Sequence, residues 1–336
     1  MKGPVLCFGE LLLRLSPPGR RLLAQSQSLD LAVGGAEANV AVGLSSLGHE
    51  TRMLSKISDN PLGRLIGAEL RARGVDTAHV TAGEGRVGLY FLEQGQGLRA
   101  SSITYDRAGS SFALATEDQF DFESALDGAR LLHMSGITPA LGPKSAQTAL
   151  AAAHAAKAAG VPISFDGNYR GQLWAQWESD PRAILTQLVG MCSILFGNHR
   201  DISLLLGTSF SGEGVAERRR AAQAAFEAFP NLELIASTAR DVVNADCHNI
   251  SARIDRRDSV IQTEPLAVTG IVDRIGTGDA FAVGILDGWL NGRSDGLMAR
   301  SGLALAALKH SVPGDMSLFT REDLDGFEGG GFDVRR

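Results

Sequence analysis

Residues 129–168 read ARLLHMSGITPALGPKSAQTALAAAHAAKAAGVPISFDGN, and this stretch decides the fold. An apolar strand is expected at 129–136, followed by an Ala-rich helix over 143–160 with Gly160 at its C-terminal cap. A second strand is expected at 161–168, and it ends in polar residues. A helix that connects two strands is the unit of a parallel sheet, so the stretch predicts such a sheet with helices packed against it.

The same rhythm continues toward the C-terminus. Residues 191–198 repeat the design of a buried strand with a polar end, and two helices are expected over 201–207 and 212–229. Another strand is expected at 232–238. Alternation of this kind predicts an α/β protein in which helices cover both faces of a mostly parallel sheet.

Two segments break the rhythm, because they have β character without intervening helices. They lie at about 9–35 and 86–108, and the second contains Gly-Gln-Gly between two strand-like arms, which is typical of a hairpin. They either form a small accessory sheet beside the main one or are irregular surface hairpins. No repeat or composition shift marks a linker, so we expect a single domain over residues 1–336.

Composition excludes several function classes. The formal net charge is −6 and no long basic run occurs, which argues against nucleic acid and anionic membranes as partners. No apolar stretch approaches the roughly 20 residues that span a membrane. Three cysteines far apart and without metal-ligand spacing indicate a reduced, cytoplasmic protein with no disulfide framework.

The sequence DRIGTGDAFAVG, residues 273–284, carries the chemistry. An apolar helix is expected to begin near Gly278, and the first N–H groups of a helix have no partner within it. Glycines let those groups approach an oxyanion, so the loop Gly276–Gly278, with Thr277, is a candidate anion hole. Asp279 beside a phosphate would be a base for an attacking hydroxyl, unless it merely caps the helix.

Other nucleotide motifs are missing. The sequence has no G-x-x-x-x-G-K-[ST], which excludes a P-loop enzyme. The run GTGDAF ends in Phe281 where a dinucleotide fingerprint has its third glycine, which makes an oxidoreductase a weak alternative.

Two segments together resemble the ribokinase-like (PfkB) carbohydrate kinases. Residues 273–284 resemble the C-terminal signature of that family, and VGGAEANVAVGLSSLG at 33–48 resembles the N-terminal one. The likeness extends over residues 4 to 320. It implies a ribokinase-like three-layer α/β fold with a small β-sheet lid formed by the two segments without helices.

Within the family, GGAEANVA, GRVGLYFLE, ITYDRAGS, HMSGITPAL and DGNYR resemble the 2-keto-3-deoxygluconate kinases most. The resemblance implies transfer of phosphate from ATP, with Mg²⁺, to that sugar acid to give its 6-phosphate. It also implies a homodimer or higher oligomer through the lid. A kinase of fructose, ribose or 2-keto-3-deoxygalactonate, and a sugar-binding relative without catalysis, are the alternatives. A monovalent-cation requirement is left open.

Site residues follow from the same resemblance. Guanidinium groups bind carboxylates through paired hydrogen bonds, so two arginines in loop-like stretches suit an acid sugar. Each expected sugar-binding residue also has a purely structural interpretation, such as a turn glycine, a packed tyrosine or an ion-paired arginine. The expected sugar-binding residues are Gly34, Gly35, Asn39, Tyr90, Tyr105, Arg107, Arg170 and Asp315.

The expected nucleotide side departs from the family pattern. Asp201 stands where relatives have a glutamate near magnesium, and it would act through water. Arg274 and Thr277 replace the usual threonine and alanine. Arg240 reaches a phosphate or is an ordinary surface arginine. The expected nucleotide-binding residues are Asn198, Ser237, Thr238, Arg240, Gly278 and Gly314.

Overall fold

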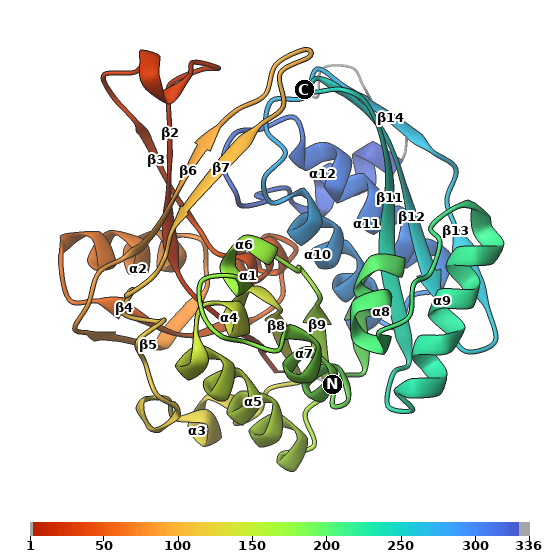
Figure 1. Ribbon diagram of the computed structural model, residues 1–336, viewed down its shortest axis with the longest axis horizontal. Coiled ribbons are helices and arrows are strands. Elements are labelled where there is room, and N and C mark those ends of the chain that lie inside the picture. The colour runs from red at the N-terminus through yellow and green to blue at the C-terminus, as the bar shows by residue number, and fades with distance from the viewer. Residues whose placement is uncertain (1–2, 329–336) are drawn as a thin grey trace.

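The computed structural model describes residues 3–328, and its largest element is a mostly parallel sheet (Figure 1). Within the described residues the sheet has ten strands, in the order β13-β12-β11-β10-β9-β8-β1-β4-β5 with β14 beside β12. In this order, all neighbouring strands from β11 through β10, β9, β8, β1 and β4 to β5 are parallel. Strand β12 pairs antiparallel with β11, β13 and β14. The bounds are β1 Val5–Phe8, β4 Thr51–Ser58, β5 Asp76–Gly83, β8 Leu131–Ser135, β9 Ile163–Asp166, β10 Ile194–Phe196, β11 Leu234–Asn244, β12 Cys247–Asp255, β13 Val260–Gln262 and β14 Leu266–Thr269.

Helices cover both faces of this sheet, as the sequence predicts. Because side chains alternate along a strand, Val5 and Cys7 of β1 enter one core while Leu6 and Phe8 enter the other. The first core is closed by α1 (Ala36–Ser46), α2 (Pro61–Ala72), α10 (Thr277–Leu290), α11 (Asp295–Lys309) and α12 (Arg321–Glu328). The second is closed by α3 (Phe122–Leu126), α4 (Ile137–Ala140), α5 (Pro143–Ala158), α6 (Gly171–Trp174), α7 (Pro181–Val189), α8 (His199–Leu206) and α9 (Gly214–Ala228).

The segments without helices form a separate four-stranded sheet, which confirms the accessory-sheet alternative. Its order is β3-β2-β6-β7, with β2 Leu12–Ser16, β3 Asp30–Gly34, β6 Gly88–Glu93 and β7 Ser102–Asp106. We call it the lid sheet. Leu29 and Leu31 are exposed beside and on β3, at 39% and 43%. A dimer through this sheet, and a single domain over 1–336, stay predictions.

The lid hairpin meets the β11–β12 hairpin at their tips (Figure 1). Gly97 N–H donates to an Asp246 carboxylate oxygen at 2.8 Å, and Ala245 N–H donates back to the Gly97 carbonyl at 2.8 Å. Arg20 donates to Asp246 and to the carbonyl of Ile271, on the approach to the loop before α10. The two hairpins therefore form an arch over the space between them.

Element bounds differ from expectation in one place that bears on function. The strand expected at 232–238 continues to Asn244, because its partner β12 pairs with it along this whole length. Arg240 consequently lies on this strand, opposite Ile250, beyond the end of the expected strand. No helix in the described part of the chain has the length and apolar character needed to cross a membrane.

Candidate active site

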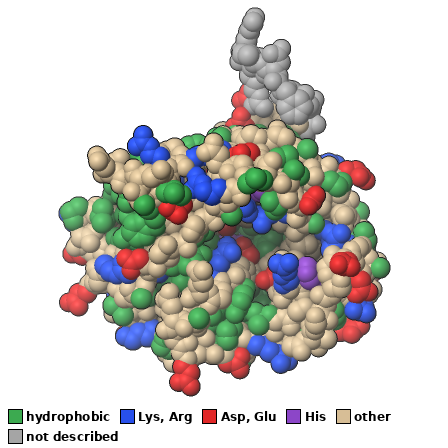
Figure 2. Space-filling model, turned by 45° about the horizontal axis from the view of Figure 1, so that its top comes forward, with side chains coloured by type: hydrophobic (Ala, Val, Ile, Leu, Met, Phe, Trp, Pro, Cys, Tyr) green, Lys and Arg blue, Asp and Glu red, His purple; other side chains and the backbone are tan. Residues whose placement is uncertain are grey.

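A cavity of about 1150 Å³ lies between the lid sheet, the ends of β9 to β11 and the start of α10. Figure 2 shows the hollow, with Lys and Arg side chains beside it. Parallel strands end at this edge of the sheet, which is where α/β proteins place ligands. The predicted residues that line it are Gly35, Asn39, Tyr90, Tyr105, Arg107, Arg170, Asn198, Ser237, Thr238, Arg240, Gly276, Thr277, Gly278, Asp279 and Asp315.

The Gly276–Gly278 loop opens α10, which begins at Thr277. Gly276 has φ +77°, and a Cβ there would lie 1.7 Å from the Asp315 carbonyl oxygen, so only glycine fits. A Cβ on Gly278 would enter open space. No described residue accepts from the N–H of Gly276 or Gly278, whereas Thr277 bonds back to the Arg274 carbonyl through N–H at 3.4 Å and Oγ1 at 3.0 Å. Two backbone donors therefore remain available at a positive helix end.

Asp279 lies at the third position of α10 and makes no capping bond to its own helix among the described contacts. Its Oδ2 accepts a hydrogen bond of 2.6 Å from Asn39 Nδ2 on α1. Burial raises the pKa of Asp279 to about 7, against the opposing effect of the Asn39 bond. Asn39 keeps its Oδ1 buried and without a described partner. The carboxyl is thus held in place with a pKa near neutrality.

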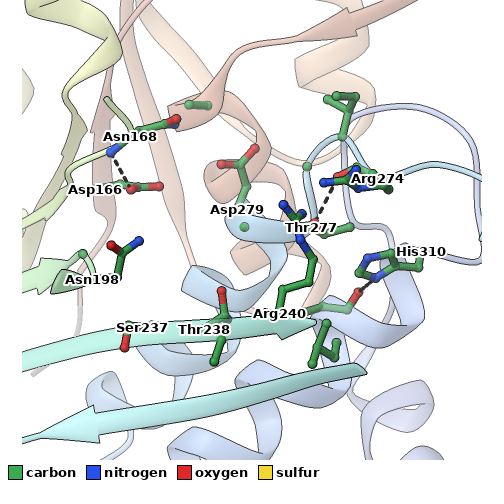
Figure 3. Close-up of a pocket in the computed structure, with 18 of the residues that line it drawn as sticks. Asp166, Asn168, Asn198, Ser237, Thr238, Arg240, Arg274, Thr277, Asp279 and His310 are labelled. Carbon is green, nitrogen blue, oxygen red and sulfur yellow. Dashed lines mark hydrogen bonds between the residues drawn. The ribbon is translucent and has the colours of Figure 1, made fainter. Parts of the chain in front are cut away.

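Asp166 was not predicted from the sequence, yet it lines the same cavity (Figure 3). It ends β9, and burial, then the charges of Asp279 and Asp201, raise its pKa to about 8. The signal was present in the sequence, because Asp166 directly follows an apolar strand at the edge where ligands bind. Asn168, with φ +36°, donates its N–H to Asp166 at 3.1 Å and tightens the loop.

A buried charge network connects the lid sheet to the loop before α10. Arg14 of β2 donates to Asp273 at 2.7 Å and forms an ion pair of 3.0 Å with Asp315. Tyr90 of β6 donates its hydroxyl to Asp315 at 2.6 Å. Asp315 therefore accepts a hydrogen bond through Oδ2, while its Oδ1 has the ion pair with Arg14 but no hydrogen-bond partner among the described residues, and the residue also lines the cavity.

Two predicted glycines support this network and do not line the cavity. A Cβ on Gly34 would lie 2.3 Å from an Asp315 carboxylate oxygen, so Gly34 gives room to the network. Gly314 donates its N–H to Asp273 at 3.1 Å. Gly35 does line the cavity, with φ +141° and no space for a Cβ beside the Glu10 carbonyl.

The two predicted arginines differ in their surroundings. Arg107 is 4% exposed and donates through Nε to the buried carboxylate of Glu10 at 2.5 Å. Arg170 is exposed to the cavity and forms no ion pair with any described residue. Its charge opposes the raised pKa values of Asp166, Asp201 and Asp279, so it lies within electrostatic reach of all three.

Several of the predicted nucleotide-binding residues lie on the wall of the cavity opposite the lid sheet. Ser237, Thr238 and Arg240 follow one another on β11, and Asn198 caps α8 by accepting from Arg200 N–H at 2.8 Å (Figure 3). Asp201 does not line the cavity. Its carboxylate closes the capping box of α8 by accepting from Asn198 N–H at 2.8 Å, and its charge acts on Asp166. The indirect role of Asp201 near magnesium stays a prediction.

Comparison with known proteins agrees with this architecture. Residues 3–321 match the model of the pfkB family carbohydrate kinases. The chain is 32% identical over 97% of its length to a 2-dehydro-3-deoxygalactonokinase of Haloferax volcanii, covering 96% of it. It is 28% identical over 97% of its length to a 2-dehydro-3-deoxygluconokinase of Bacillus subtilis, again covering 96% of that protein.

Among solved structures, the crystal structure of 2-dehydro-3-deoxygluconokinase from Thermotoga maritima superposes with a TM-score of 0.93 at 34% identity. The superposition covers 98% of this chain and 99% of the other. The family model and these similarities agree with the two-sheet architecture. The chain belongs to the PfkB family of ATP-dependent carbohydrate kinases.

Proposed function

We propose that this kinase transfers the γ-phosphoryl group of ATP to the 6-hydroxyl of 2-keto-3-deoxygluconate and releases the 6-phosphate. The observation that carries the proposal is the position of Asp279. A carboxyl with a pKa near 7 lies beside two unpartnered backbone donors, Gly276 N–H and Gly278 N–H, in one cavity.

The reaction needs a base for the acceptor hydroxyl and positive potential for the transferred group. Asp279 takes the hydroxyl proton as the oxygen attacks phosphorus, and the bond from phosphorus to ADP breaks. Asn39 orients Asp279 through Oδ2, which leaves Oδ1 for the proton. Gly276 and Gly278 N–H groups and the positive end of α10 stabilise the charge on the transferred oxygens.

An acid sugar fits the arginine that has no protein partner. Arg170 brings an unpaired guanidinium to the cavity, while the guanidinium of Arg107 is joined to Glu10. We therefore assign binding of the substrate carboxylate to Arg170 and give Arg107 a supporting role in the lid. Tyr105, paired across the strands with Tyr90, lines the cavity from the same sheet and contacts the sugar in this proposal.

Magnesium would bind at the donor phosphates. Among the described residues no group of three or more His, Cys, Asp or Glu side chains could hold a metal alone. Mg²⁺ needs no such group, because it is usually bound by one or two carboxylates together with phosphate and water. Asp166 fits this requirement, since burial and then the charges of Asp279 and Asp201 raise its pKa, and a cation would offset those charges. When bound, the ion neutralises charge on the phosphates.

The substrate assignment is tested by initial rates on a panel of sugars with ATP and Mg²⁺. We expect turnover of 2-keto-3-deoxygluconate and little of fructose or ribose. Arg170→Ala should raise KM for the acid sugar about 10- to 100-fold and change kcat less, because a charged hydrogen bond is lost. Arg200→Ala, an arginine on α8 at the cavity wall, is the matched control.

The outcomes separate the alternatives. Equal rates on fructose, with no effect of Arg170→Ala, would replace the acid sugar by a neutral one. Absence of ADP release with every sugar would favour a non-catalytic binding protein.

A second candidate substrate is 2-keto-3-deoxygalactonate, which is favoured by the 32% identity to the Haloferax volcanii kinase named for that acid. The two acids carry the same carboxylate, so Arg170 does not separate them. A ratio of kcat/KM values measured for both in one competition assay decides between them.

A further inference from the structure

Two arginines face each other on the donor wall without any carboxylate between them. Arg240 extends from β11 toward Thr277, and Arg274 lies on the loop directly before α10 (Figure 3). Neither side chain forms an ion pair or a hydrogen bond with a described residue, and Arg274 Nε is buried without a partner. By contrast, Arg20, Arg219 of α9, Arg253 of β12 and Arg256 are all paired with carboxylates.

The two guanidinium groups repel each other. Burial and the charge of Arg274 lower the pKa of Arg240, and burial lowers the pKa of Arg274. His310 is 3% exposed, lines the cavity, and has an Nε2 without a partner among the described residues. Like charges held together destabilise a fold unless an anion joins them. Arg240 is exposed and Arg274 is half-buried at the cavity wall, so both guanidinium groups are accessible to an anion that enters the cavity.

We propose that Arg240 and Arg274 form a two-guanidinium clamp for the phosphate chain of the donor, which makes donor affinity depend on a chain of at least two phosphates. The proposal rests on the proposed kinase function and adds Arg274 to it. The Gly276–Gly278 loop receives the terminal phosphate, and the adjoining phosphate lies between the two guanidinium groups, each of which suits phosphate through parallel N–H donors.

The clamp also explains two departures from the family signature. Arg274 and Thr277 stand where a threonine and an alanine are usual, and Thr277 Oγ1 bonds to the Arg274 carbonyl at 3.0 Å. Thr277 thereby fixes the backbone from which Arg274 projects. In this arrangement the long side chain of Arg274 binds phosphate, and the hydroxyl of Thr277 holds the backbone of Arg274 in place.

The test is a calorimetric binding measurement without sugar, using ATP, inorganic tripolyphosphate and adenosine on the full chain. Arg274→Ala and Arg240→Ala should each weaken ATP and tripolyphosphate binding about 10- to 100-fold and leave adenosine binding unchanged. Arg274→Lys should fall between, because it keeps the charge and loses the fork. Arg220→Ala, an exposed arginine on α9 that is paired with Glu217, is the control and should bind all three as the wild type does.

Thermal unfolding of the ligand-free variants separates the clamp from a structural role. Removal of an arginine that stabilises the fold would lower the Tm. Because the two charges repel, Arg274→Ala and Arg240→Ala should have a Tm equal to or above that of the wild type. Unchanged tripolyphosphate affinity, a parallel loss of adenosine binding, or a lower Tm in Arg274→Ala would each overturn the clamp. Since sugar is absent, a wrong assignment of the acceptor leaves these results unaffected.

Discussion

The two walls of the cavity treat charge in opposite ways. On the lid side, Arg14 is paired with Asp273 and Asp315, and Tyr90 donates a hydrogen bond to Asp315, all within a buried network. On the donor side, Arg240 and Arg274 have no counter-ion among the described residues. The charges of the lid side are therefore paired within the protein and stabilise the fold.

The donor side has positive charges without partners among the described residues, and we propose that a ligand supplies those partners. Unpaired charges lower stability, but they add to affinity when an anion brings its own charge. Asp279 and Asp166 lie between the walls, with pKa values raised to about 7 and about 8. The difference teaches that charges with partners within the fold support the structure, whereas charges without such partners are the ones that we propose to bind ligands.

The largest effect is expected at the boundary between the walls. Asp279→Asn should lower kcat about 10²- to 10⁴-fold, because the amide cannot take the proton of the attacking hydroxyl. ADP release under saturating substrates measures it. Asn39→Ala, which removes only the bond that orients Asp279, should lower kcat less. Turnover by Asp279→Asn at the wild-type rate would exclude this carboxyl as the base.

On the lid side, Arg14→Ala should lower the free energy of unfolding by about 3–5 kcal/mol, because Asp273 and Asp315 lose the cation that they share. Urea titration monitored by circular dichroism gives the value. The control Arg64→Ala removes an exposed pair of 3.8 Å to Asp59 and should cost less than about 1 kcal/mol. Equal losses in both variants would show that the network has no special weight.

The smallest effect concerns pH and stability. The pKa of Asp279 is raised to about 7 from its ordinary 3.8, so its neutral form is the favoured one and its contribution to stability is lost as pH rises through that range. Asp279→Asn should therefore raise the free energy of unfolding at pH 8 by about 1–4 kcal/mol, and the gain should shrink toward pH 4.

The matched control for this measurement is Asp127→Asn, at an exposed aspartate. It should show no gain that depends on pH in the same denaturation series. A pH-independent change in Asp279→Asn would mean that packing, and not ionisation, is responsible.

Much of this site was predictable from short patterns. The strand, helix and strand of residues 129–168 appear as β8, α5 and β9, because their apolar periods and the glycine at 160 are local properties. Gly276, Gly278 and Asp279 lie together because they are neighbours on the chain at the start of a helix.

Contacts between distant segments were harder to predict. The sequence placed Arg107 and Arg170 together as carboxylate-binding residues, but only tertiary packing pairs Arg107 with Glu10, 97 positions away. The pKa of Asp166 is raised by burial and by the charge of Asp279, which lies more than 100 residues later in the chain. The strand expected to end at residue 238 continues through Arg240 to Asn244 because β12 supplies a pairing partner.

The sequence alone determined the α/β architecture and the glycine loop with its acidic neighbour, since both arise from residues close along the chain. The tertiary structure alone decided which charges are neutralised and which remain available, because pairing depends on segments that meet only when the two sheets and their helices are packed.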